Sequence, residues 1–191
     1  MPFLPLVDVF GDEVVLELFS EAALVEHWLE FERALAAAQA ELGIIPAGAA
    51  EAIAAEATAD RVDLGLLREQ TRVVGYPILP LLEQLRRGCA SEVGGYLHWG
   101  ATTQDVMDTG LALTLARAFD RIETLLVDLG GAVAAKAEEH RGTIMTGRTH
   151  AQPAVPITFG GKLAVWLAEL ARHLDRVRSA REGVAFVQLF G

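Results

Sequence analysis

The longest helical signal in this chain runs from Thr103 to about His140, and it limits the possible folds more than any other feature. These 38 residues contain no proline, and apolar side chains recur along them at a helical period. At a rise of about 1.5 Å per residue the helix would span roughly 55 Å, longer than a small globular domain usually needs. The segment therefore predicts a bundle of long helices. Its apolar stripe consists of Val106, Leu113, Ala116, Ile122, Leu126, Leu129 and Val133.

A second long helix is predicted from Ile157 onward, with an apolar stripe of its own. Two long helices each bury one face, so further helices must cover the rest. The chain also ends on an apolar run, residues 184–191. We expect either a longer protein or partner subunits to cover these faces, and we favour a fragment of a longer protein. The second stripe consists of Leu163, Trp166, Leu170, Leu174 and Val177.

The first part of the chain predicts shorter helices. Ser20 is placed as an N-cap before a helix that Gly43 and Pro46 end. The apolar residues along this helix follow a helical period: Leu24, Trp28, Phe31, Leu35 and Ala38. Further helices are predicted at Ala47–Ala59, Asp63–Gln70 and Pro77–Arg87.

Gly94 and Gly95 interrupt the helical pattern, and we place a domain boundary after residue 95. No segment shows the alternation typical of a strand. The predicted fold class is all-α, with an N-terminal helical domain (1–95) followed by the first long helices of a central bundle (96–191).

Composition excludes several classes of protein. The formal charge of −10 argues against non-specific binding of nucleic acid, which needs a basic surface. The single cysteine, Cys89, cannot form an internal disulfide. We predict no transmembrane helix and no signal peptide, and a cytoplasmic location.

Two polar loops stand out in this apolar sequence. One is His98-Trp-Gly-Ala-Thr-Thr103, and the other is Gly147-Arg-Thr-His-Ala-Gln-Pro-Ala-Val-Pro156; each is predicted to lead into a long helix. His98 and His150 lie in these loops, where binding residues concentrate, although each His could instead only cap a helix. His27, His140 and His173 lie on predicted helices among charged residues, and we expect them to be solvated.

The start of the long helix is suited to binding an anion. Thr102 and Thr103 offer hydroxyls beside free N–H groups, although one of them is also expected to be the N-cap. Asp105 and Asp108 fit a simple interaction with the helix dipole. Neither a metal-binding motif nor a glycine-rich nucleotide loop is recognisable in the sequence.

The two loops, read with the residues that follow them, resemble the first two shared motifs of the fumarase/aspartase superfamily. The resemblance is to the branch with adenylosuccinate lyase and 3-carboxy-cis,cis-muconate cycloisomerase. The first motif is His98-Trp-Gly-Ala-Thr-Thr-Gln-Asp-Val-Met-Asp-Thr109, and the second runs from Gly147 to Lys162. The resemblance implies an all-α homotetramer that catalyses β-elimination without a cofactor or metal and releases fumarate from a small succinyl-type substrate.

The resemblance also implies roles for individual residues. His150 would be the general acid, Thr102 and Thr103 would hold substrate carboxylates, and His98 would contact the leaving-group portion. Thr149 and Gln152 would line the pocket, and Lys162 would add positive charge.

The sequence departs from the family pattern in three ways. The third motif, which carries the serine base, is absent, so we predict no turnover by the 191-residue chain alone. The His-Asp pair that precedes the first motif in adenylosuccinate lyases is missing from residues 69–77. Bacterial carboxymuconate cycloisomerases often have Trp where this chain has His150. The cycloisomerase activity and a non-catalytic helical assembly protein remain the alternatives.

Overall fold

The computed structural model describes residue 7 and residues 9–191, and these residues form two compact units. Unit 1 extends to Leu115 and includes the last residues, Ala185–Gly191. Unit 2 comprises Ala116–Val184. The domain boundary expected after residue 95 stays a prediction.

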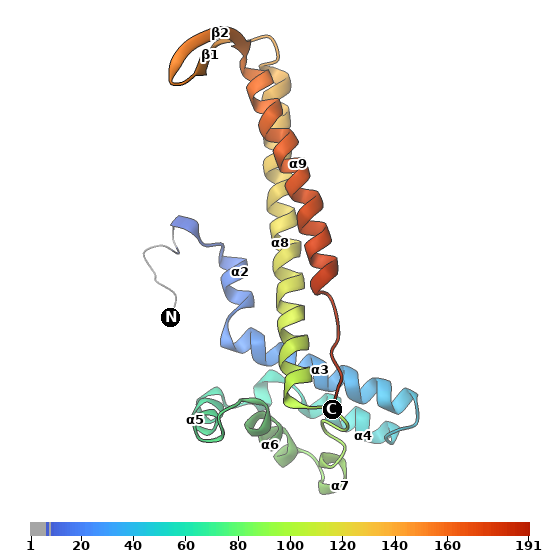
Figure 1. Cartoon of the computed structure of the whole chain (residues 1–191). Coiled ribbons are helices and arrows are strands. Elements are labelled where there is room, and N and C mark those ends of the chain that lie inside the picture. The colour runs from blue at the N-terminus through green and yellow to red at the C-terminus, as the bar shows by residue number, and fades with distance from the viewer. Residues whose placement is uncertain (1–6, 8) are drawn as a thin grey trace. The chain divides into compact units, whose positions relative to one another are not determined.

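Short helices make up most of unit 1 (Figure 1). Polar side chains cap several of them: Ser20 accepts a hydrogen bond from the Ala23 N–H (3.1 Å), and Asp63 accepts one from the Leu66 N–H (3.0 Å). Gly75 ends α5 with φ +94°, a conformation that glycine adopts readily. The elements are α2 (Glu13–Leu18), α3 (Glu21–Glu41), α4 (Ala47–Glu56), the 3-10 helix Ala59–Arg61, α5 (Leu64–Val74), α6 (Ile78–Gly88), α7 (Ser91–Gly94) and the first part of α8 (Thr103–Glu139).

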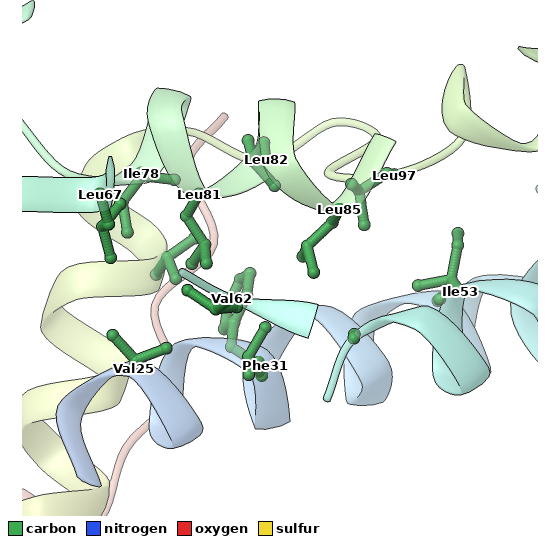
Figure 2. Packing of buried hydrophobic residues seen from close by; sticks show 14 of the residues in the cluster. Val25, Phe31, Ile53, Val62, Leu67, Ile78, Leu81, Leu82, Leu85 and Leu97 are labelled. Atoms are coloured by element: carbon green, nitrogen blue, oxygen red, sulfur yellow. The ribbon is translucent and has the colours of Figure 1, made fainter. Parts of the chain in front are cut away.

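The hydrophobic core of unit 1 lies between α3 and the helices α4 to α6 (Figure 2). Leu29, Ile78 and Leu81 are fully buried in it. Burying side chains of this size contributes about 1.5–3 kcal/mol each, so this cluster is a main source of stability for unit 1. The core also includes Val25, Phe31, Ile53, Val62, Leu67, Leu82, Leu85, Leu97 and Val106.

The most buried face of α3 adjoins its apolar period. Of the five apolar residues of that period Phe31 is buried, and Trp28 and Leu35 are partly buried against the core. The buried positions Val25, Leu29, Glu32, Ala36 and Gln39 lie one residue further along the chain, and two of them are polar.

Unit 2 consists of the rest of α8, a β-hairpin and α9 (Phe159–Val184) (Figure 1). Strand β1 (Ile144–Thr149) pairs antiparallel with β2 (Gln152–Thr158). The prediction that the chain has no strand was therefore wrong, although the all-α class holds for a structure that is mostly helical. Arg178 contacts Glu123 (2.8 Å) and Arg181 pairs with Asp120, so two ion pairs link α9 to α8.

Both long helices were predicted closely. The expected helix from Thr103 to about His140 is α8, which ends at Glu139, and α9 begins two residues after Ile157. None of the helices that the structure describes combines the length and apolar character that a bilayer span needs.

Candidate active site

The loop that joins α7 to α8 has a constrained backbone. His98 has φ +64° and Gly100 has φ +71°, so both residues lie in the left-handed region. For a side chain such as that of His98, this conformation costs about 1–3 kcal/mol and persists only where the surroundings hold it. Conformations of this kind concentrate at functional sites.

Helix α3 holds this loop through two buried polar side chains. Glu32 Oε1 lies 2.6 Å from His98 Nδ1, and Gln39 Nε2 donates a hydrogen bond to the Trp99 carbonyl oxygen (2.7 Å). The Glu32 side chain is only 1% exposed and that of His98 13% exposed. The predicted site residue His98 is thus fixed by a carboxylate that the sequence analysis did not select.

Thr102 and Thr103 lie where α8 begins, as the sequence predicted. The Thr102 N–H donates to Asp105 Oδ2 (2.9 Å), so Thr102 has the position of an N-cap residue. Within the described part of the chain, neither threonine hydroxyl makes a hydrogen bond. The first N–H groups of this 37-residue helix and two hydroxyls therefore lie together, an arrangement that favours an anionic ligand.

Asp105 binds the last residues of unit 1. Its buried carboxylate accepts hydrogen bonds from the N–H groups of Phe190 (2.9 Å) and Gly191 (3.1 Å) as well as from Thr102. Burial raises the pKa of Asp105, but these backbone donors, with a contribution from Gln188, outweigh it and lower the pKa overall. Asp105 therefore does more than interact with the helix dipole, the role that the sequence predicts for it.

The other predicted site residues belong to unit 2. His150 (φ +48°) and Ala151 (φ +61°) form the two-residue turn of the β-hairpin, between the paired residues Thr149 and Gln152. Positive φ at both positions defines a type I′ turn, which normally favours Asn-Gly. Side chains 149–152 are exposed, so the turn presents His150 to solvent.

Lys162 lies in the first turn of α9, also exposed, with its Nζ 5.5 Å from the centre of the Trp166 ring. It borders an open hollow of about 460 Å³ that is also lined by Ile157 and Val165. Lys162 therefore places a positive charge on the surface of unit 2, and its expected role at the substrate stays a prediction.

His27 differs from the expectation that it is solvated. It is 1% exposed, and its Nδ1 lies 2.8 Å from the Thr114 hydroxyl. Thr114 donates its own hydrogen to the Gly110 carbonyl (3.0 Å), so His27 must be the donor to Thr114. His27 is thus a packing residue of unit 1. Among the described residues, no group of three or more His, Cys, Asp or Glu side chains is arranged to hold a metal ion.

Comparison with known proteins identifies the class to which this long-helix fold belongs. Residues 12–191 match the family model described as Lyase, so the chain belongs to this family, within the fumarase/aspartase superfamily. The chain spans about two-fifths of the length of the curated relatives that it matches (38–42%).

Its relatives have several activities. The chain is 36% identical to the adenylosuccinate lyase of Methanocaldococcus jannaschii over 95% of its own length and 39% of that protein's. A fumarate lyase structure from Mesorhizobium sp. BNC1 matches 94% of this chain and 42% of its own, with 46% identity and a TM-score of 0.89. The β-carboxy-cis,cis-muconate cycloisomerase structure from Acinetobacter calcoaceticus has 35% identity and a TM-score of 0.92, covering 98% of this chain and 44% of its own.

Proposed function

We propose that this protein is a cofactor-free lyase that releases fumarate from a succinyl-type substrate by β-elimination. The observation that carries the proposal is the start of α8, shortly after the constrained residue His98, where two threonine hydroxyls without a hydrogen bond to any described residue accompany the first N–H groups of a long helix. A dicarboxylate suits this arrangement because its negative charge is favoured at a helix N-terminus. Family membership supports the reaction class.

In the proposed reaction a base removes a proton from the carbon beside a carboxylate. The electron pair forms the double bond of fumarate, and the bond to the leaving nitrogen or oxygen breaks. Thr102 and Thr103 hold the substrate carboxylates and stabilise the charge that develops there. His98 contacts the leaving-group portion. We assign no residue of this chain as the base.

His150 is the proposed general acid, which gives a proton to the leaving atom. Exposure at a hairpin turn leaves its ring free to meet a substrate, and an imidazole can exchange protons near neutral pH. Thr149 and Gln152 flank it in the same turn, and Lys162 supplies positive charge. We further propose that the protein acts in the cytoplasm as a homotetramer, which would cover the exposed apolar side chains of α8 and α9 such as Leu129 and Val165.

The test is to add adenylosuccinate to the full-length protein that contains these residues and to follow fumarate by its ultraviolet absorbance. We expect fumarate to form, and His150→Gln to lower kcat by about 10²–10⁴-fold, the usual contribution of a general acid. The matched control is His173→Gln, which changes another exposed histidine of unit 2 and should leave kcat unchanged.

The cycloisomerase is the second candidate because this chain is 35% identical to a muconate cycloisomerase structure, with a TM-score of 0.92. Adding 3-carboxy-cis,cis-muconate to the same protein separates the two reactions, since ring closure gives a lactone and no fumarate. A folded protein that acts on neither substrate and binds no fumarate would refute both and support a non-catalytic assembly role.

A further inference from the structure

The contact between Glu32 and His98 connects the interior of unit 1 to the proposed substrate-binding loop. The two side chains come from positions 66 residues apart, and Glu32 Oε1 lies 2.6 Å from His98 Nδ1. Glu32 Oε2 is buried and has no hydrogen-bond partner among the described residues. The His98 ring is therefore the side-chain partner of a carboxylate that water does not reach.

The hydrogen of this contact belongs on the ring nitrogen. Nδ1 lies 2.6 Å from Glu32 Oε1, and the Glu32 side chain is buried. A buried carboxylate needs a donor, and the Nδ1–H supplies it. The hydrogen bond at one ring nitrogen decides which tautomer a histidine adopts. Nδ1 then carries the hydrogen, and Nε2 is the nitrogen left for a ligand.

The loop cannot easily turn the ring away from Glu32. Gln39, two helical turns along α3 on the same face, binds the Trp99 carbonyl and fixes the backbone next to His98. His98 itself has a left-handed backbone conformation, as does Gly100. The orientation of the ring is thus held from the backbone and from the side chain together.

We propose that Glu32 is a positioning residue that fixes His98 as the Nδ1–H tautomer and leaves Nε2 to meet the ligand. That the ligand is the leaving-group portion of a succinyl substrate rests on the proposed function; the tautomer does not. Glu32 acts through His98 and does not touch the substrate.

The test is nitrogen-15 NMR of the histidine rings in the 191-residue chain, with the His98 signals assigned by their loss in His98→Gln. At a pH where the ring is neutral, we expect the hydrogen on Nδ1. Glu32→Met keeps the length of the side chain but removes the acceptor, so the ring should change to the Nε2–H form that is favoured in water. Glu26→Met is the matched control, because it makes the same change on the same helix at a carboxylate that pairs with Arg33, and it should leave the tautomer unchanged.

A wild-type ring with its hydrogen on Nε2 would overturn the proposal, because Glu32 would then be the donor. The same is true if Glu32→Met keeps the Nδ1–H form. The wild-type measurement decides even if Glu32→Met does not fold. A confirmed tautomer with no fumarate release by the full-length protein would refute the proposed function and leave the positioning role of Glu32 in place.

Discussion

Replacing Asp105 with asparagine should detach the last residues of unit 1 from α8. The carboxylate accepts three backbone hydrogen bonds: Oδ1 binds the N–H of Phe190, and Oδ2 binds those of Thr102 and Gly191. An asparagine has one oxygen and one NH₂ group. In either orientation of the amide, the NH₂ group faces at least one backbone N–H, and that hydrogen bond is lost.

The size of the effect follows from the number of bonds lost. A hydrogen bond to a charged acceptor contributes about 1.5–3 kcal/mol. Losing one of the three therefore weakens the attachment of this segment by about 2 kcal/mol, which is about 30-fold in the equilibrium constant for local opening.

Hydrogen exchange of the backbone amides of Phe190 and Gly191 measures this opening directly. Asp105→Asn should accelerate their exchange about 30-fold at neutral pH. Asp108→Asn is the matched control, since Asp108 lies on the same helix and its hydrogen bond comes from the Gln104 side chain. Exchange that changes less than about threefold in Asp105→Asn, in a chain with native circular dichroism, would show that the carboxylate does not hold the segment.

Two further predictions concern the pH dependence of the Asp105 contribution to stability and the substitution of two glycines by alanine. The pKa of Asp105 is lowered in the folded state, so its stabilising effect is present above about pH 4 and is lost as the pH falls through the folded pKa. The difference in unfolding free energy between wild type and Asp105→Asn should therefore become smaller in acid. Gly160→Ala should destabilise by about 1–3 kcal/mol in urea unfolding, because a Cβ there would lie 2.6 Å from Arg141 Cα. Gly130→Ala has open space around it and should instead stabilise by about 1 kcal/mol; equal effects of the two substitutions would contradict the packing argument.

The sequence predicted the fold well where the apolar period of a helix is regular and no proline interrupts it. Helix α8 begins at Thr103 and ends one residue before the expected end, because no proline interrupts it and its apolar period is regular. The β-hairpin was missed for the opposite reason. Residues 151–157 are all exposed, so β2 has no buried face to produce an alternating pattern, and Pro153 and Pro156 within it oppose a strand prediction.

The buried polar residues of α3 could not be predicted. Glu32 and Gln39 are buried and make hydrogen bonds to the loop before α8, and a hydrophobic pattern counts such residues as surface. The loop residues His98, Thr102 and Thr103 were selected from their chemistry. The side chains beneath them were not, because nothing in a sequence pairs position 32 with position 98.

The attachment of the last residues to Asp105 couples the lengths of two helices. The chain leaves unit 1 after Leu115 and must return to it by Ala185, so everything between is an insertion with both ends fixed in the same unit. Adding residues to α8 alone would move the start of α9 along the chain path and pull the N–H groups of residues 185–191 away from their acceptors, Asp105 and Thr109. Changes in length should therefore be tolerated only in matched pairs, by about seven residues or two turns in each helix, so that the side chains keep their faces.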